Sequence, residues 1–326
     1  MKYYAIGSLA AAGLVAGLFG SQAIGQSTPD TAEAHIAAAK AAAGHDHMAL
    51  FNSVCGPAPG PAAATTAPVT PRAAPERSTW YVEPVKVFDN LYFVGEKEYS
   101  AWAVTTSEGI TIVDTIWEYS VEDSIVGGLK KLGLDPAKIK YAIVTHAHRD
   151  HIGGAKYLQD TFGARIILSA ADWDLAEKSS RLPVKPKRDM VITDGQKLTL
   201  GDTTLTLYVT PGHTPGTIST LIPVKDGGRP HLAAEWGGTA FNFDLVPENF
   251  QIYVNSAQRF GDIVAKAGAD VLIANHTNND GSKTKLPALA QRKSGDPNPY
   301  VIGNDGVRRY VKVAEECARA NLLRMK

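Results

Sequence analysis

The sequence predicts a mixed fold of the α/β or α+β class, in which two mixed β-sheets carry helices on their outer faces. Two observations lead to this expectation. From Ser78 onward, short apolar or alternating runs typical of strands are separated by turn residues, chiefly Asp-Asn, Gly and Ser-Glu-Gly. The same layout then comes twice, with hairpins first and alternating strands and helices afterwards. The chain has 326 residues, and we expect this region to form one compact domain.

The first half of this region begins with strand-like runs and then alternates helices with strands. Its expected strands are residues 85–95, 100–109, 110–115, 140–145 and 164–169. The helix expected at residues 120–134 has apolar residues on one face: Val121, Ile125, Leu129 and Leu132. Two shorter helices are expected at residues 153–163 and 171–179, and Gly163 ends the first of them.

The second half repeats this order. A hairpin is expected at residues 196–210, and strands are expected at 217–224 and 231–236. A long amphipathic pattern then predicts a helix over residues 248–268. A last strand and a closing helix are expected at residues 270–275 and 307–323.

The N-terminus has the layout of a secretory signal peptide over residues 1–25. One lysine supplies a positive charge, an apolar run (5–19) follows, and small residues offer cleavage after Ala23 or Gly25. The apolar run is shorter than the roughly 20 residues of a membrane span, although an uncleaved anchor helix is the alternative. We therefore expect a periplasmic or secreted protein that has no membrane attachment after cleavage.

Two further segments separate this leader from the folded region expected at residues 79–326. Residues 26–55 are rich in alanine and indicate one or two helices, whereas residues 56–78 are rich in Pro and Ala and indicate a semi-extended linker. Cys55 and Cys317 are the only cysteines. In an oxidising compartment they form one disulfide that ties the ends of the mature chain together, or they remain two unpaired thiols.

Charge and composition narrow the classes of partner. The chain has 33 Lys and Arg residues against 33 Asp and Glu residues, so its formal net charge is zero. A nucleic-acid-binding protein usually shows a basic patch, and no basic cluster is interleaved with aromatic residues here. We expect a small-molecule substrate and no nucleic-acid partner, whereas the sequence does not indicate an oligomeric state.

The stretch "VTHAHRDHIGG", residues 144–154, crowds three histidines and one aspartate into six positions. His146 and His148 are two residues apart at a strand end, so on extended backbone their side chains point the same way. Asp150 and His151 follow after a turn. A single zinc ion takes about four ligands, and a catalytic site leaves one position for water. Four potential ligands in one loop, with others elsewhere, therefore predict two metal ions.

Two other loops each place a histidine directly after an apolar strand. His213 stands in "TPGHTPGT" and His276 in "IANHTNND". Of the nine histidines in the chain, five lie in these three loops. A lone histidine after a strand is usually an ordinary polar group, but the edge that follows the strands is where mixed α/β folds gather ligands. We therefore add both residues to the candidate metal site.

The motifs "THAHRDHIGG", "PGHTPGT" and "ANH", in this order, resemble those of the metallo-β-lactamase superfamily over about residues 80–326. The resemblance implies an αβ/βα sandwich of four layers with a site for two zinc ions at one edge. It assigns three residues to each zinc ion: His146, His148 and His213 to the first, and Asp150, His151 and His276 to the second. It also implies that Asp114, in "IVDT", supports the site from behind.

Within the superfamily, the chain is most similar to the third subclass of class B β-lactamases, or to a β-lactamase-like branch with another substrate. The signal peptide, His151 and the lack of a late ligand cysteine carry this similarity, whereas the alanine-rich N-terminal segment and the long C-terminal tail fit it less well. Many hydrolases of the superfamily place a metal-bridging aspartate where Glu235 stands here. Glu235 either bridges or binds metal, or it points away while Trp236 and Gly237 line the pocket.

The family's chemistry implies the mechanism. A metal-bound hydroxide, oriented by Asp150, attacks a carbonyl carbon that the first zinc ion polarises. The leading expectation is hydrolysis of the cyclic amide of a β-lactam. The alternatives are a lactonase or another ester or amide hydrolase of the same fold, and a periplasmic zinc-binding protein without enzymatic activity.

Candidate substrate contacts follow from the loops that overhang such sites in the family. They are Tyr99 and Ser100 on one side, with Trp236 and Thr239 opposite. No arginine or lysine is clearly placed in the sequence to bind a substrate carboxylate.

Overall fold

The computed structural model describes residues 1–4, 30–60, 70, 73–293 and 295–325. Most of the predicted signal peptide, with both of its cleavage positions, lies outside the described residues. So does the middle of the predicted linker. Among the helices that are described, none is long and apolar enough to cross a membrane.

Seven strands form the first sheet, in the order β1-β2-β3-β4-β5-β6-β7. Strands β1 to β4 pair antiparallel, whereas β4 to β7 pair parallel. The strands are β1 (Val85–Lys86), β2 (Leu91–Phe93), β3 (Trp102–Thr106), β4 (Gly109–Val113), β5 (Ile139–Ile143), β6 (Arg165–Ser169) and β7 (Met190–Ile192). Parallel strands end at the same edge, so the loops after β4 and β5 lie next to each other.

Five strands form the second sheet, in the order β12-β11-β10-β9-β8. Only the β11–β12 pair is parallel. The strands are β8 (Gln196–Leu200), β9 (Thr203–Val209), β10 (Ile218–Asp226), β11 (Arg229–Glu235) and β12 (Val271–Ile273).

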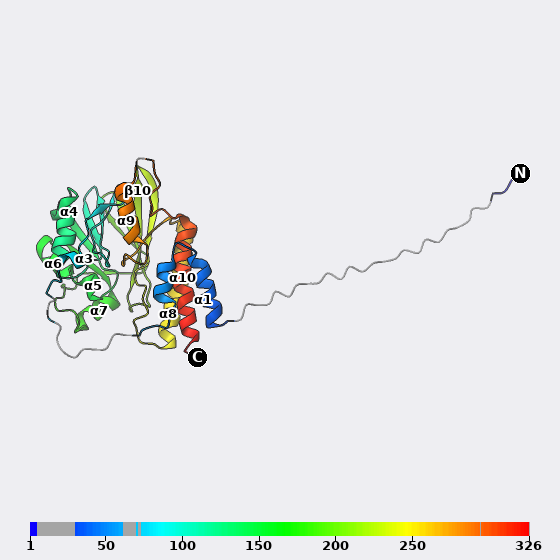
Figure 1. Cartoon of the computed structure of the whole chain (residues 1–326), viewed down its shortest axis with the longest axis horizontal. Coiled ribbons are helices and arrows are strands. Elements are labelled where there is room, and N and C mark those ends of the chain that lie inside the picture. The colour runs from blue at the N-terminus through cyan, green and yellow to red at the C-terminus, as the bar shows by residue number, and fades with distance from the viewer. Residues whose placement is uncertain (5–29, 61–69, 71–72, 294, 326) are drawn as a thin grey trace.

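Helices cover the outer face of each sheet (Figure 1). On the first sheet lie the π-helix η1 (Glu122–Val126), α4 (Gly127–Lys131), α5 (Arg149–Ile152), α6 (Ala155–Phe162) and α7 (Ala170–Lys178). On the second sheet lie α8 (Pro247–Ala267) and α10 (Gly303–Leu323), and α1 (Ala32–Ala43) and α2 (Met48–Val54) pack on α10. Three apolar clusters fill the helix–sheet, sheet–sheet and sheet–helix interfaces. The predicted sandwich of two mixed sheets with outer helices is therefore confirmed.

Most predicted elements are found close to their expected bounds, and the clearest difference is an extra helix. Helix α9 (Ser282–Gln291) was not expected from the sequence, because Pro287 interrupts its pattern. In the structure only Ser282 and Leu286 of this helix are buried. Two short elements complete the list: α3 (Arg77–Trp80) precedes β1, and the 3₁₀ helix η2 (Pro136–Lys138) directly precedes β5.

The N-terminal helices pack on the C-terminal helix. Helix α1 begins at the N-cap Thr31, whose side chain accepts a hydrogen bond from the Ala34 amide, and Ala39 and Ala43 pack against α10 in the same apolar cluster. Cys55 and Cys317 form a disulfide between the end of α2 and α10, so the structure contains the pairing that the sequence left open. The disulfide thereby joins the N-terminal helical segment to the C-terminal helix, outside the sheets.

Candidate active site

The predicted ligands meet at one edge of the sandwich, each in a segment that follows a strand. The segment after β5 supplies four of them, with His146 and His148 in its loop and Asp150 and His151 in the short helix α5. The loop after β9 supplies His213, and the loop after β12 supplies His276. They form two groups of three whose ligand atoms lie within 4.8 Å of one another. We call His146, His148 and His213 the first triad, and Asp150, His151 and His276 the second triad.

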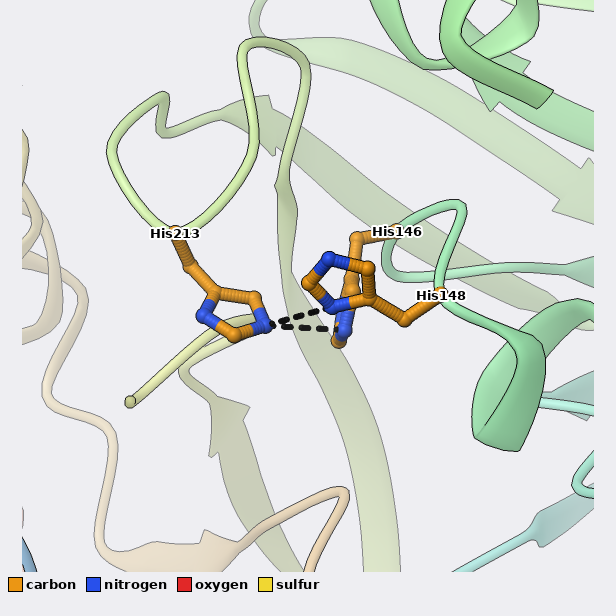
Figure 2. A group of neighbouring side chains, drawn as sticks. All are labelled: His146, His148 and His213. Carbon is orange, nitrogen blue, oxygen red and sulfur yellow. Dashed lines mark hydrogen bonds between the residues drawn. The ribbon is translucent and has the colours of Figure 1, made fainter. Parts of the chain in front are cut away.

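Three ring nitrogens converge in the first triad (Figure 2). His213 Nε2 lies 3.0 Å from His146 Nε2 and 3.0 Å from His148 Nδ1. The opposite nitrogens face backbone carbonyls, because His146 Nδ1 lies 3.0 Å from the Gly237 oxygen and His213 Nδ1 lies 2.7 Å from the Ala240 oxygen. A carbonyl only accepts hydrogen bonds, so both Nδ1 atoms carry a proton.

This arrangement fits a metal ion. With Nδ1 protonated, neutral His146 and His213 each present the lone pair of Nε2, and the two lone pairs face each other at 3.0 Å. Such a contact between two acceptors is repulsive unless a cation shares both lone pairs. Imidazole nitrogens held in this way by a second hydrogen bond are typical zinc ligands.

The second triad contains a carboxylate. His151 Nε2 lies 3.2 Å from His276 Nε2 and 3.3 Å from Asp150 Oδ2. His151 is fully buried, whereas Asp150 and His276 are partly exposed. Two imidazoles and one carboxylate are likewise a donor set that zinc accepts.

Asp114 holds this region from behind, where the resemblance places it. Its Oδ2 accepts from His151 Nδ1 at 2.8 Å and from the Thr145 hydroxyl at 2.9 Å. Its Oδ1 accepts from the Thr145 amide at 2.7 Å. Asp114 has a φ of 60°, which is an uncommon backbone conformation for a residue with a Cβ. Such conformations cluster at functional sites, where the surrounding contacts hold them.

Burial and charge set the proton affinities of the two triads apart. Burial, followed by the neighbouring histidines, holds the pKa of His146 well below its usual value, and burial lowers that of His148 to about 4. Burial also lowers the pKa of His151, but the carboxylates of Asp150 and Asp114 more than offset it and raise this pKa to about 10. Without metal at neutral pH, the first triad is therefore uncharged, whereas His151 is protonated.

Two glycines allow the ligand loops to approach this closely. A Cβ on Gly154 would lie 2.3 Å from the Thr115 oxygen, and a Cβ on Gly238 would lie 2.5 Å from His213 Cβ. Gly154, the second glycine after the histidine run, therefore lets the start of α6 lie against the segment after β4.

An open cavity of about 1320 Å³ lies above the triads. Its walls include His146, His148, Asp150, His213 and His276. Residues of the N-terminal segment also reach it, namely Ser53 at the end of α2 together with Thr70 and Ala73. Arg149, in the ligand loop, is paired with Glu118 and donates to the Thr70 carbonyl at 3.2 Å.

The predicted substrate contacts are only partly at this cavity. Thr239 lines it, whereas Tyr99, Ser100 and Trp236 are not among its lining residues. Tyr99 instead packs its ring on His276, with 5.3 Å between ring centroids, and Ser100 is fully buried with its amide bonded to the Asn275 carbonyl. These two residues support the His276 loop from behind.

Strand geometry explains why Trp236 and Glu235 are not in the cavity. Ala233 on β11 belongs to the core between the sheets, so Glu235 shares that face, while Ala234 and Trp236 point toward α8. Trp236 Nε1 donates to the Tyr253 hydroxyl at 3.0 Å. Glu235 is fully buried and belongs to neither triad, so the structure does not place it as a bridging ligand or as a pocket residue. Burial, followed by Asp114, raises its pKa well above the usual value.

The sequence contains no sign of two cations that line the cavity. They are Lys178, at the end of α7, and Arg181, in the loop that follows. From the sequence alone, no arginine or lysine is expected there to bind a substrate carboxylate. Burial is the main cause of the low pKa of His148. Asp150 opposes this effect, whereas the charges of His151 and Arg181 lower the pKa further, so Arg181 lies close to the first triad. The loop has no motif, and only the packing of α7 against β6 brings it to the metal-binding edge.

Comparisons with known proteins agree with this architecture. The family model described as "Metallo-beta-lactamase superfamily" matches residues 94–227. An N-acyl homoserine lactonase of Bacillus sp is 30% identical over 152 residues, which are 44% of this chain and 59% of that protein. A hydroxyacylglutathione hydrolase of Acidiphilium cryptum (strain JF-5) is 38% identical over 84 residues, or 26% of this chain and 31% of that one. The chain thus spans 59% of the length of the first relative and 31% of the second.

A solved structure covers more of the chain. BJP-1, a subclass B3 metallo-β-lactamase of Bradyrhizobium japonicum, has 29% sequence identity and a TM-score of 0.64. The match covers 74% of this chain and 94% of BJP-1. Residues 94–227 thus form a domain that matches the metallo-β-lactamase superfamily model, and the fold around it is similar to that of a solved subclass B3 enzyme.

Proposed function

We propose that this protein is a zinc-dependent hydrolase that opens the cyclic amide of β-lactams. The observation that carries the proposal is the pair of ligand triads at the floor of one open cavity. The spacing between them, in which His148 and Asp150 are separated by a single residue, suits two metal ions that act on one substrate.

The residues of the chain divide the work between them. The first triad would hold one zinc ion and the second triad the other. Bound zinc supplies an activated water and polarises a carbonyl group. Asp150 provides a partly exposed carboxylate: in the metal-free chain burial raises its pKa, but the charge and hydrogen bond of His151 more than offset this and hold that pKa well below the usual value. This carboxylate can accept a hydrogen bond from the water and orient it.

The charges on the cavity wall favour an anionic substrate. Lys178 and Arg181 line the cavity. Of the two acidic residues there, Glu98 is bonded to Lys283 at 2.7 Å and Asp150 belongs to the second triad. Penicillins and cephalosporins carry a carboxylate next to the reactive ring, and an N-acyl homoserine lactone carries none. The cationic wall therefore favours a β-lactam over a neutral lactone, and this supports the structural likeness to subclass B3 enzymes.

Lactone hydrolysis is the second candidate, and one observation favours it. The relative found by sequence over 152 residues is a lactonase. A five-membered lactone ring would need the same activated water and polarised carbonyl. Its neutral head group would gain nothing from Lys178 and Arg181.

A paired assay separates these functions. The purified protein, loaded with zinc, is expected to hydrolyse nitrocefin, to lose this activity in a chelator and to regain it when zinc is added back. Arg181→Ala is expected to raise KM for nitrocefin about tenfold with little change in kcat, which corresponds to about 1.4 kcal/mol of binding. KM for a neutral N-acyl homoserine lactone should not change.

Three outcomes would reject parts of this proposal. Turnover of the lactone without turnover of any β-lactam at micromolar enzyme would make the protein a lactonase. Two bound zinc ions without turnover of either class would favour a zinc-binding protein that is not an enzyme. The absence of bound zinc would remove the metal from the proposal.

We also propose that the protein acts after export, on a small-molecule substrate. The pattern of residues 1–25 supports export, and the disulfide suits an oxidising compartment. Fractionation of producing cells, followed by N-terminal sequencing of the mature chain, tests both the compartment and cleavage after Ala23 or Gly25.

A further inference from the structure

We propose that Asp172 is a positioning residue that sets the geometry of the first triad by tying its two loops together. The residue lies on α7 and contacts no ligand histidine itself. The inference concerns metal binding, so it holds whichever substrate the enzyme hydrolyses.

The contacts of Asp172 reach both ligand loops. Its Oδ2 accepts from the Ala147 amide at 2.8 Å and from the Thr214 hydroxyl at 2.8 Å. Its Oδ1 accepts from the Gly216 amide at 2.8 Å. Ala147 stands between His146 and His148, and Thr214 directly follows His213. One carboxylate therefore bonds the neighbours of all three ligands.

Asp172 itself is held firmly. It is 1% exposed, and it lies in the first turn of α7, where its amide donates to the hydroxyl of the N-cap Ser169 at 3.2 Å. The N-terminal turn of a helix favours a negative side chain, and three donors directed at one carboxylate are stronger than neutral hydrogen bonds. The loops are thus bonded to a rigid element rather than only to each other.

The loop that carries His213 is shaped for this contact. A Cβ on Gly216 would lie 1.9 Å from Ser169 Oγ and 2.7 Å from the Asp172 nitrogen. Only glycine lets the loop approach the start of α7 so closely. Thr217 strengthens the same corner, because its hydroxyl lies 2.7 Å from that of Thr214 and accepts from the Thr214 amide at 3.0 Å. This corner gives the second glycine of "PGHTPGT" a physical purpose.

The second triad has no comparable contact with Asp172. Its support comes from Asp114, which bonds His151 directly. Zinc requires nitrogen atoms about 2.0–2.1 Å away, so a small displacement of one loop lowers affinity, and outer partners of metal ligands typically contribute 10–100-fold to it. We therefore expect loss of the Asp172 contacts to weaken the first triad alone.

The test measures zinc affinity by competition with a chromophoric chelator, in two backgrounds that each leave one triad complete. In His276→Ala only the first triad is intact, and in His148→Ala only the second is. Asp172→Asn keeps the size of the side chain but places an amide N–H against a donor. It is expected to lower zinc affinity 10–100-fold in the His276→Ala background and less than twofold in the His148→Ala background.

Two further variants keep the test decisive. Asp174→Asn, on the same helix, removes an exposed carboxylate that pairs with Arg188, and should change neither affinity. Thr214→Val removes one of the three donors, and is expected to lower first-triad affinity severalfold even if Asp172→Asn folds poorly. Equal weakening of both triads, or a lower melting temperature with both zinc affinities unchanged, would show that Asp172 only stabilises the fold and would overturn the proposal.

Discussion

The two triads differ in charge although they lie side by side. The first has three imidazoles, and the Nδ1 atoms of His146 and His213 face uncharged backbone carbonyls. The second includes the carboxylate of Asp150, and a second carboxylate, Asp114, bonds His151 from behind. The first triad therefore offers lone pairs that are ready for a metal ion. In the second triad a proton on His151 occupies the place of the metal, so zinc has to displace it.

This difference teaches how one loop can build two unlike sites. His148 and Asp150 are separated by a single residue, but the turn between them begins α5 and sends the later pair toward the first sheet. There Asp114, after β4, meets His151, whereas the earlier pair faces the loops of the second sheet. Four predictions test the contrast, from the largest expected effect on the site to the smallest.

Removal of a ligand should have the largest effect. His148→Ala is expected to bind about one zinc ion fewer per chain and to lose roughly 10³-fold in kcat/KM, since a catalytic metal ion contributes several kcal/mol. Mass spectrometry of the native protein and steady-state kinetics measure both quantities. His45→Ala, which removes an exposed histidine on the turn after α1, is the matched control. Full zinc content and activity in His148→Ala would contradict the assignment.

Asp114→Asn should weaken the second triad more than the first. The amide oxygen can replace one carboxylate oxygen, but its N–H₂ then faces donors from Thr145 or His151. We expect a 10–100-fold loss of zinc affinity at the second triad, where Asp114 bonds a ligand directly, and a smaller loss at the first, which Asp114 reaches only through Thr145. Chelator competition in the His148→Ala and His276→Ala backgrounds measures the two separately. A loss confined to the first triad would refute this division of support.

The pH dependence of zinc binding should also separate the triads. In the first triad, burial lowers the pKa of His148 to about 4 and holds those of His146 and His213 well below the usual value, so at pH 7 zinc displaces no proton. In the second, the carboxylates raise the pKa of His151 to about 10 despite burial. Zinc therefore displaces one proton, and its affinity should rise about tenfold per pH unit between roughly pH 6 and 9.

Calorimetry in two buffers with different ionisation enthalpies counts these protons. The His148→Ala variant, which retains the second triad, should release about one proton per zinc ion at pH 7. The His276→Ala variant should release about none. The same proton count in both variants would mean that the charge difference between the triads does not govern binding.

The disulfide should affect the site least. Cys55 and Cys317 lie in the apolar cluster between the second sheet and its helices, and neither lines the cavity. The double variant Cys55→Ser/Cys317→Ser is expected to lose about 2–5 kcal/mol in the free energy of unfolding. Urea unfolding measures this loss. Zinc affinity should stay within about twofold at both triads, and a larger change would show that the helices transmit strain to the site.

Much of the fold was predictable because its signals are local. Helix α6 ends at Gly163 in the left-handed conformation, as a C-terminal glycine predicts, and the hairpin β8–β9 follows from alternating residues around Gly201-Asp202. Helix α9 escaped prediction because Pro287 contradicts the usual helical pattern. Its stability comes from tertiary contacts such as that of Leu286 with the core between the sheets.

The candidate site divides in the same way. The crowding of "HAHRDH" and the strands before His213 and His276 were enough to select six residues, and the structure brings all six into the two triads. Asp172, Lys178 and Arg181 had no signal of their own. Each of them meets the ligand loops or the cavity only through contacts between segments that are distant in sequence. In a sequence, an isolated acidic or basic residue usually indicates a solvated surface group.

The sequence by itself determined which chemistry the protein holds: five histidines and an aspartate after apolar strands, spaced as metal ligands. The tertiary structure alone decided how these residues are held and what faces them. Because side chains alternate along β11, Glu235 points toward the core between the sheets. The packing of α7 brings Asp172 against the loops of the first triad and places Lys178 and Arg181 at the cavity wall. Ligand identity is written in short motifs, whereas orientation and support depend on contacts between segments that only the complete fold brings together.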